Sequence, residues 1–299
     1  MTIIKQYING NVNVTLYDNG TKIREWDGVQ KVEFPESIDV KITDYCLMGC
    51  KFCHEMSTYK GNHGNLEVLR IKLSSLPSGI DLAIGGGNPL DHYGVVEFLT
   101  WCKDKGYICN LTMNQGHIRK YGGNSTTKYA KMLRTLIDNK LIYGLGISVN
   151  TIGDVDLVYN DNTIFHVIAG VHNISIIDTI KSKYENPKIL VLGYKSVGFG
   201  ITYFNKEVND NIWNWKMHIP KYFGNTNVAF DNLAVKQLEI KKWFTDDEWA
   251  KYYMGDDGTT SMYIDAVKGE YAVSSTSSIR TSWKELGVKQ YFKEMQNVK

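Results

Sequence analysis

Three cysteines stand close together early in the chain, where Cys46, Cys50 and Cys53 follow a C-x3-C-x2-C spacing. Thiolates at this spacing can reach one metal cluster. A closed tetrahedral zinc site needs four protein ligands, and so does a 4Fe-4S cluster with a purely structural role. Three ligands leave one iron with an open coordination position. A substrate or cosubstrate can bind there through its own nitrogen and oxygen atoms and accept an electron directly.

The cysteine spacing, with Phe52 directly before the last cysteine, resembles the cluster loop of the radical S-adenosylmethionine (SAM) superfamily. The resemblance covers about residues 37–200 and indicates no subfamily. It implies that Cys46, Cys50 and Cys53 hold a 4Fe-4S cluster and that Phe52 packs near the adenine of SAM. It further implies that the open iron chelates SAM and that one electron cleaves it to methionine and a 5′-deoxyadenosyl radical. This radical abstracts a hydrogen atom from the substrate.

A zinc site is the alternative for this loop, with His54 or His63 as the fourth ligand. Zinc sites more often combine two separated ligand pairs, such as two C-x2-C units or one such unit and a histidine pair. The sequence contains no second unit of this kind. The spacing therefore favours an iron-sulfur cluster.

Strand and helix patterns alternate along the chain from residue 37 onward, and we interpret them as six βα units. Such units indicate an α/β fold with a parallel sheet, because each parallel connection needs a crossover that a helix supplies. The resemblance implies that the sheet curls into a partial (β/α)6 barrel, with SAM across the C-terminal ends of its strands. The predicted strands are 37–44, 80–84, 107–113, 145–150, 164–168 and 189–193, and the predicted helices are 66–76, 92–105, 125–139, 174–183 and 206–216.

Two extensions flank this core, which we assign to residues 37–220. Residues 1–36 are predicted to form an N-terminal β-hairpin, with strands around the turn at 18–20. Residues 221–299 are predicted to form a C-terminal α+β extension that covers the barrel within the same globular unit. Its predicted elements are a strand at 227–235, a helix opened by a capping box at Thr245 and a hairpin at 261–274.

The run Gly85, Gly86, Gly87 and Asn88 directly follows the second predicted core strand. Glycine lets the backbone approach a ligand closely, so that peptide groups can hydrogen-bond a small zwitterion. The run resembles the Gly-Gly-Glu-Pro motif that holds the SAM amino group in the radical SAM superfamily. Asn88 stands where that motif has Glu, and it offers a carbonyl acceptor without a charge. An ordinary strand-to-helix turn is the alternative.

Polar residues also end two other predicted strands. Ser148 and Asn150 share one strand face, because side chains alternate with period two. They resemble the pair that contacts the SAM ribose and carboxylate, although Asn150 also suits a helix N-cap. The segment from Tyr194 to Val197 resembles the adenine-contacting end of the sixth strand. A loop without ligand contacts is the alternative there.

Lys195 and Asp231 are the two candidate catalytic residues on the substrate side. Both are charged residues set among apolar neighbours. Such a charge must be paired or functional to offset the cost of desolvation. We therefore expect one or both of them to act on the substrate.

The composition is that of a globular protein, with 299 residues, 43% of them apolar and 22% charged. Basic and acidic residues number 34 and 32, so the net charge is only +2. A charge this small does not attract the phosphate backbone of a nucleic acid strongly, and nucleic-acid binding is not expected. No apolar run approaches the ~20 residues that cross a bilayer, and no signal-peptide core follows Met1. Five cysteines, three of them clustered, favour a reducing compartment over a disulfide framework. We therefore expect a cytoplasmic protein.

The substrate is the most open part of the sequence analysis. Beyond the cysteine loop only Cys102 and Cys109 remain, and we interpret them as buried core residues. They leave no ligands for the auxiliary iron-sulfur domain of many peptide-modifying relatives, which favours a small-molecule substrate such as a nucleotide or a deazapurine precursor. A peptide or protein substrate is the alternative, because the N-terminal hairpin offers a sheet edge for strand addition. The alternative of a different class is a non-catalytic metal-binding interaction module. The resemblance also implies an electron donor such as flavodoxin or ferredoxin.

Overall fold

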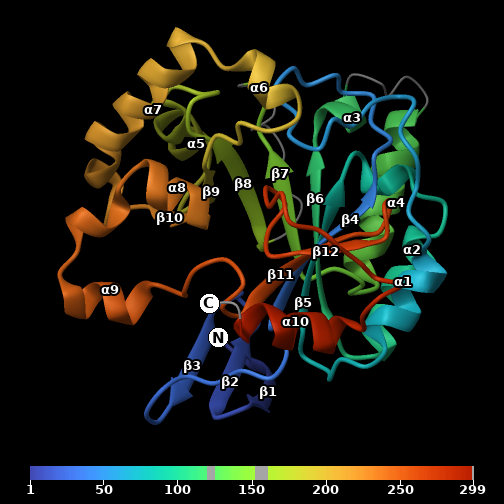
Figure 1. The fold of residues 1–299 in the computed structure, drawn as a ribbon. Coiled ribbons are helices and arrows are strands. Elements are labelled where there is room, and N and C mark those ends of the chain that lie inside the picture. Colours follow the sequence, from blue (N-terminus) through green and yellow to red (C-terminus); the bar gives the residue numbers. More distant parts are fainter. Residues whose placement is uncertain (120–124, 152–160, 298–299) are drawn as a thin grey trace.

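One sheet of ten strands runs through the molecule, of which the computed structural model describes residues 1–119, 125–151 and 161–297 (Figure 1). Its strand order is β10-β9-β8-β7-β6-β5-β4-β11-β12-β13. Pairing is parallel from β10 to β11 and antiparallel from β11 to β13. The strands are β4 (Ser37–Thr43), β5 (Asp81–Gly86), β6 (Ile108–Asn114), β7 (Gly144–Ser148), β8 (Thr163–Ile168), β9 (Lys188–Leu192), β10 (Asn227–Phe230), β11 (Ser261–Asp265), β12 (Glu270–Ala272) and β13 (Thr281–Ser282).

The predicted α/β fold with a parallel sheet is confirmed, and each of the six predicted core strands corresponds to one strand from β4 to β9. These strands lie side by side in chain order, as successive βα units require. The outer strands β10 and β13 do not pair with each other. In the part of the chain that the structure describes, the sheet is therefore open rather than a closed barrel.

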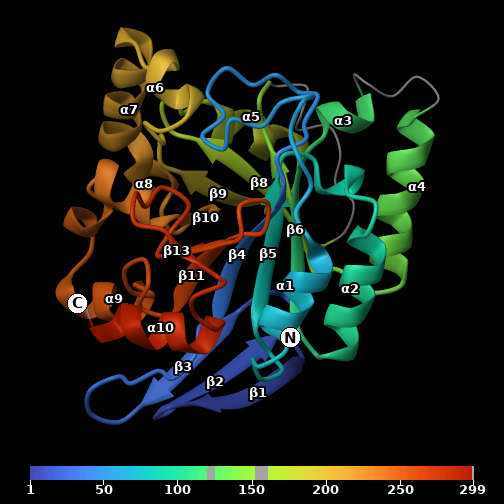
Figure 2. The same ribbon diagram turned by 45° about the vertical axis from the view of Figure 1, so that its right-hand side comes forward.

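Helices α1, α2 and α4 lie against one face of the sheet (Figure 2). Their sequences explain both their limits and their packing: α1, for example, begins where the Asn65 side chain accepts a hydrogen bond from Val68 N, and it buries Leu66, Leu69 and Leu73. The helices of the core and C-terminal part are α1 (Leu66–Leu73), α2 (Val95–Asp104), α3 (Gly116–Arg119), α4 (Ser125–Asp138), α5 (Ile176–Lys183), α6 (Phe199–Tyr203), α7 (Lys206–His218), α8 (Asn232–Gln237), α9 (Asp246–Tyr252) and α10 (Val288–Asn297), with short 3-10 helices η1 (Pro89–Asp91), η3 (Ile219–Tyr222) and η4 (Ile240–Trp243).

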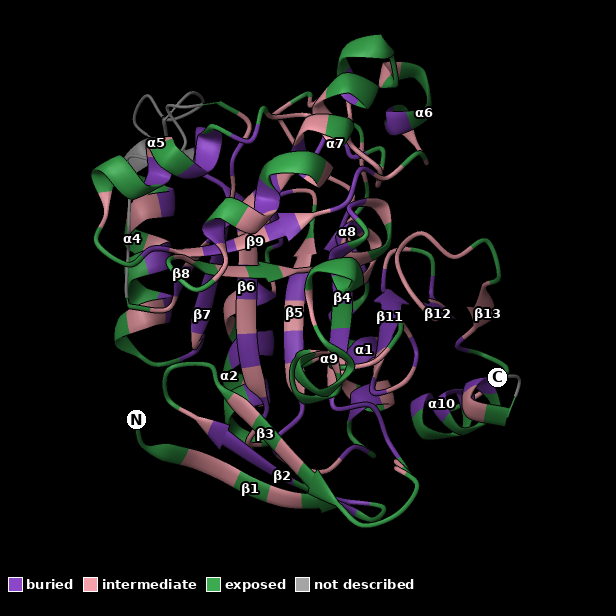
Figure 3. Ribbon diagram, turned by 90° about the vertical axis from the view of Figure 1, so that its left-hand side faces the viewer, coloured by how far each residue is buried: buried purple, intermediate pink, exposed green. Residues whose placement is uncertain are grey.

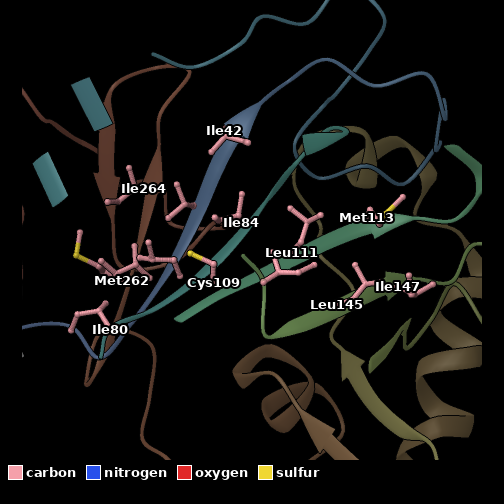
Figure 4. Packing of buried hydrophobic residues seen from close by; sticks show 14 of the residues in the cluster. Ile42, Ile80, Ile84, Cys109, Leu111, Met113, Leu145, Ile147, Met262 and Ile264 are labelled. Atoms are coloured by element: carbon pink, nitrogen blue, oxygen red, sulfur yellow. The ribbon is translucent and has the colours of Figure 1, made fainter. Parts of the chain in front are cut away.

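The two faces of the sheet differ in burial, because side chains alternate along each strand. Side chains on the helix-covered face, such as Ile42, Ile84 and Leu111, are fully buried and form the core (Figure 4). Many of the alternate side chains, above all those of β5, β6, β8 and β9, stay partly exposed, as the strand colours show (Figure 3). We call this second face the open face. Its exposed and partly exposed residues include Asp39, Ala83, Asn110, Thr112, His166 and Leu190.

The N-terminal extension is a three-stranded antiparallel sheet, where the sequence analysis predicted a hairpin. Its strands are β1 (Ile3–Asn9), β2 (Val12–Tyr17) and β3 (Lys22–Trp26). The additional strand is possible because Gly10 makes a tight turn at φ +64°, where a Cβ atom would lie 2.0 Å from Lys31 O. The turn at 18–20 joins β2 and β3, as predicted.

This N-terminal sheet lies across the N-terminal ends of the core strands, on the opposite side of the molecule from the loop that follows β4 (Figure 1). Asn162 Nδ2 donates to Asp18 O at 2.9 Å, and Lys188 Nζ donates to Asn19 O at 3.2 Å. A pocket of about 190 Å³ lies between this turn and the starts of β5, β6 and β9. The sheet thus covers the N-terminal ends of the core strands.

The C-terminal part extends the main sheet. The predicted strand at 227–235 is only half correct, because β10 ends at Phe230 and Asp231 caps helix α8. The predicted capping box at Thr245 and the predicted hairpin at 261–274 are confirmed. β11 also pairs in parallel with β4, from Ser261 opposite Ser37 to Asp265 opposite Lys41. Among the described residues, none of the helices has the length and apolar character needed to span a membrane.

Candidate functional site

The three-cysteine loop begins where β4 ends, above the C-terminal ends of the core strands (Figure 2). Backbone hydrogen bonds fix its shape: Cys46 N donates to Thr58 O at 2.9 Å, and Cys53 N donates to Cys50 O at 3.1 Å. All three cysteines are partly exposed. The fold therefore presents three thiols from one loop, at the end of the sheet where ligands of parallel α/β proteins bind.

Two polar side chains from other elements contact the cysteine sulfurs. Asn150 Nδ2 lies 2.8 Å from Cys50 Sγ, and His117 Nε2 lies 3.5 Å from Cys46 Sγ. Burial lowers the pKa of His117 to about 4, so its imidazole is neutral at pH 7. Burial, and then the neighbouring cysteines, raise the pKa of Cys46 to about 11. A cation bound by these sulfurs would favour the thiolate form of Cys46.

The cysteine loop supplies three thiols, the number of protein ligands that would leave one iron of a 4Fe-4S cluster open. Among the described residues, no three or more Cys, His, Asp and Glu side chains are grouped around one ion position. Cysteines that hold a 4Fe-4S cluster bind different irons and need no such grouping. The histidines of the zinc alternative have other contacts: His54 Nε2 lies 3.3 Å from Glu55 Oε1, and His63 Nδ1 lies 2.8 Å from Thr43 Oγ1.

The glycine run after β5 packs directly against the start of the cysteine loop. Gly87 N donates to Thr43 O at 2.7 Å, and Asn88 N donates to Tyr45 O at 2.8 Å. A Cβ atom on Gly87 would lie 2.1 Å from Tyr45 O, so only glycine fits there. These two amides hold the loop in place and do not point at a ligand. Gly85 borders open space, with Thr112 Cβ 3.8 Å from its ideal Cβ position.

The two ends of the Asn88 side-chain amide differ in their hydrogen bonding. Its Nδ2 donates to Asp91 Oδ2 at 2.8 Å, whereas its Oδ1 is buried and has no hydrogen-bond partner among the described residues. Tyr129 OH donates to the other oxygen of Asp91. The charge of Asp91 also contributes to the raised pKa of Cys46, which places this carboxylate near the cysteine loop. The sequence analysis missed Asp91. It stands three residues after Asn88, at the end of η1, and this short spacing could have indicated that the two side chains meet.

The other predicted SAM contacts lie around the same loop. Ser148 ends β7, where its backbone oxygen accepts a hydrogen bond from Asn114 Nδ2 at 2.9 Å. The residues after Thr151, which would show whether Asn150 caps a helix, lie outside the described residues up to 160. Phe52 packs edge-on against Tyr203, with 5.6 Å between ring centroids.

The segment after β9 also reaches the cysteine loop. Phe199 N donates to Cys53 O at 3.1 Å, and Gly198, at φ +58°, would place a Cβ atom 2.4 Å from His54 O. Val197 lies in this segment and is partly exposed. Tyr194 is buried, and its hydroxyl donates to Gly200 O at 2.6 Å. The structure therefore brings Val197 close to the loop and uses the Tyr194 hydroxyl to shape the turn.

The two candidate catalytic residues follow neighbouring parallel strands: Lys195 lies after β9 and Asp231 directly after β10. Lys195 Nζ donates to Ser275 Oγ at 2.8 Å and lies 3.2 Å from His54 Nε2. Asp231 Oδ1 accepts hydrogen bonds from Ala234 N at 2.7 Å and Gly193 N at 2.9 Å, so it has a structural role as the cap of α8. Desolvation raises the pKa of Asp231, and the charge of Lys195 offsets part of this rise.

Two further residues of the open face belong to this region, and the sequence analysis missed both. Desolvation lowers the pKa of His166 to about 4, helped by the charge of Lys195. Desolvation also raises the pKa of Asp39, while Lys195 acts in the opposite direction. Lys195 therefore lies within electrostatic reach of both. The sequence does contain a sign of both. Asp39 in β4 and His166 in β8 are polar residues that alternate with apolar core residues along their strands.

A buried cluster of charges anchors the cysteine loop to the sheet. Lys41 Nζ lies 2.7 Å from Asp44 Oδ1, 3.1 Å from Glu55 Oε2 and 3.0 Å from Asp265 Oδ2. Desolvation acts to raise the pKa of Glu55, but His54 and Lys41 outweigh it and hold this pKa far below its ordinary value. Because Asp44 and Glu55 flank the cysteines and Asp265 ends β11, Lys41 joins the loop to the C-terminal hairpin.

No protein-family model and no curated protein matches this sequence. Solved structures do match, and they show that this chain shares their fold. They include SuiB of Streptococcus suis bound to the precursor peptide SuiA, with a TM-score of 0.55, 14% sequence identity, and coverage of 87% of this chain and 65% of SuiB. SuiB bound to S-adenosylmethionine matches with a TM-score of 0.52, 15% identity, and coverage of 87% of this chain and 66% of SuiB. The chain thus spans about two thirds of the length of SuiB.

Proposed function

We propose that this chain is a radical SAM enzyme, with Cys46, Cys50 and Cys53 as the ligands of a 4Fe-4S cluster. The observation that carries the proposal is the three-cysteine loop at the C-terminal end of β4, on a fold shared with a protein that has been crystallised with SAM. The open sheet would act as the partial (β/α)6 barrel of this superfamily, with its open face toward the substrate. When bound, the cluster supplies one electron for cleavage of SAM to methionine and a 5′-deoxyadenosyl radical.

Several residues of this chain would bind SAM. Asn88 Oδ1 provides a buried acceptor for the SAM ammonium group, and Asp91 provides the negative charge that Asn88 lacks. Ser148 and Val197 would contact the nucleoside part, and Phe52 would pack near the adenine. Small residues on the open face, such as Ala83 and Gly85, leave space for a substrate beneath the loop.

We propose a peptide as the substrate, in place of the small molecule that the sequence analysis favoured. The support is the structural likeness to SuiB bound to its precursor peptide. The N-terminal sheet lies at the opposite end of the core strands from the cysteine loop, so its edge is not the place where a peptide would meet the radical (Figure 1). A peptide would enter at the C-terminal ends of the strands. An electron donor of the flavodoxin or ferredoxin type stays a prediction.

Anaerobic reconstitution tests the enzyme assignment. The chain is incubated with iron, sulfide and dithiothreitol, and iron content, the visible spectrum and 5′-deoxyadenosine formation from SAM with dithionite are measured. A radical SAM enzyme binds about four irons per chain and forms 5′-deoxyadenosine. If the chain binds the cluster but forms no 5′-deoxyadenosine, the alternative of a non-catalytic interaction module is correct. If the chain instead binds one zinc ion, the assignment of a 4Fe-4S cluster is wrong.

The substrate class is tested with the reconstituted protein. One arm presents a library of deuterated synthetic peptides, and the other presents deuterated nucleosides and deazapurines. The substrate is the compound from which deuterium appears in 5′-deoxyadenosine, as read by mass spectrometry. Deuterium transfer from a nucleoside or deazapurine, with none from any peptide, would show that the substrate is a small molecule and that the proposed peptide substrate is wrong.

We predict that Asn88→Ala weakens SAM binding by about 1 to 3 kcal/mol, the cost of leaving a charged donor without its partner in a buried site. Asp91→Asn should also weaken binding, because it removes the nearby charge. Asn88→Glu should also bind SAM more weakly than the natural chain. Its carboxylate would face the carboxylate of Asp91, at the position where Asn88 Nδ2 now donates a hydrogen bond. Calorimetric titration of reconstituted protein measures the affinities, and Asn209→Ala, at an exposed position of α7, is the control. Equal affinity of Asn88→Ala and the natural chain would refute this contact.

A further inference from the structure

Asn150 follows the end of β7 yet contacts the cysteine loop, 100 residues earlier in the sequence, with its Nδ2 2.8 Å from Cys50 Sγ. We propose that Asn150 donates an N–H···S hydrogen bond to the cluster-bound thiolate of Cys50 and thereby raises the reduction potential of the cluster. The inference rests on the proposed function. It gives Asn150 a role different from the SAM contact that the family resemblance implies.

The backbone next to Asn150 is held from two sides. Val149 N donates to His166 O at 3.0 Å, and His172 Nε2 lies 2.6 Å from Val149 O. Val149 itself is buried. The amide of Asn150 is therefore aimed at Cys50 from the rigid end of the sheet. A donor placed by a rigid element loses little conformational entropy when its bond forms.

The chemistry of the two groups fixes the direction of the bond. A carboxamide has a donor end and an acceptor end, whereas a thiolate bound to iron carries no hydrogen. Only the NH2 end of Asn150 can therefore pair with Cys50 in the loaded protein. Reduction adds one negative charge to the cluster and its thiolates, so a donor stabilises the reduced form more than the oxidised form. Hydrogen bonds to the sulfurs are among the factors that set the potential of such clusters.

The test measures the midpoint potential of the reconstituted cluster, without SAM, in a redox titration followed by electron paramagnetic resonance. Asn150→Leu removes the donor at similar volume, and its potential should fall while iron and sulfide contents stay at the level of the natural chain. Asn150→Asp replaces the donor by a carboxylate that repels the thiolate, so its potential should fall at least as far. Thr112→Val, an isosteric change on the open face of β6, should leave the potential unchanged.

An unchanged potential in a fully loaded Asn150→Leu protein would overturn the inference. So would a loss of SAM affinity at unchanged potential, because Asn150 would then contact SAM and not the sulfur. Should the leucine variant not hold its cluster, Asn150→Asp decides, and a potential equal to that of the natural chain overturns the inference. Failure of the proposed function would look different, since the natural chain itself would then bind no cluster.

Discussion

Replacing any one of Cys46, Cys50 or Cys53 by Ala is expected to abolish both the iron-sulfur cluster and SAM cleavage. Each of these residues supplies one of three thiolates, and a cluster held by two protein ligands has neither the affinity nor the single open iron that SAM needs. Iron and sulfide analysis after anaerobic reconstitution measures the first effect. The yield of 5′-deoxyadenosine measures the second.

Cys102→Ala and Cys109→Ala are the matched controls for this loss. Both residues are buried in the core: Cys102, on α2, is 0% exposed, and Cys109, on β6, is 1% exposed. Their replacement should lower stability slightly through the lost packing and leave iron content unchanged. A Cys50→Ala protein with four irons and full SAM cleavage would refute the ligand assignment.

Lys41→Met is expected to destabilise the protein by about 3 to 5 kcal/mol. The change leaves Asp44, Glu55 and Asp265 without their cation, and breaking a buried ion pair from one side costs this much because the remaining charges are uncompensated. The free energy of unfolding comes from urea titration. The exposed pair of Lys206 and Asp210 supplies the control, since Lys206→Met should change stability by at most about 0.5 kcal/mol.

The pH dependence of stability gives an independent check of the same cluster. The pKa of Glu55 is lower in the folded protein than in the unfolded chain. Its contribution is therefore fully present above the ordinary carboxyl pKa of about 4.3 and is lost as the pH falls below that value toward the lowered pKa. Without Lys41 this pKa should rise, so Lys41→Met should lose less stability than the natural chain on acidification from about pH 5 to pH 3. Equal losses would show that Lys41 does not stabilise the carboxylate.

Local patterns in the sequence predicted most of the elements correctly. Strands β4 to β9, the capping box at Thr245 and the C-terminal hairpin all appear where apolar alternation and turn residues indicated them. The cysteine loop needed only its spacing to be found. The segment 227–235 shows where such patterns fail, because its apolar residues suit both a strand and a helix. The cap made by Asp231 divides it between β10 and α8.

Long-range contacts account for the rest of what the sequence did not reveal. The pairing of β11 with β4 and the contact of Asn150 with Cys50 join residues far apart in the chain, and no local periodicity encodes them. Asp91 was missed for another reason. Its partners Asn88 and Tyr129 come together only when α4 packs beside η1. The elements of the site could thus be read from the sequence, whereas the contacts between them required the fold.

The position of β4 between β5 and β11 also has a consequence for how the protein is made. The strand that leads into the cysteine loop is completed by residues 261–265, and the contact between Lys41 and Asp265 spans 224 positions. Closing so long a loop is entropically costly, and contacts of such sequence separation slow folding. During synthesis the edge of β4 therefore stays unpaired until most of the chain has left the ribosome. We expect stable cluster insertion to follow completion of the chain rather than accompany its translation.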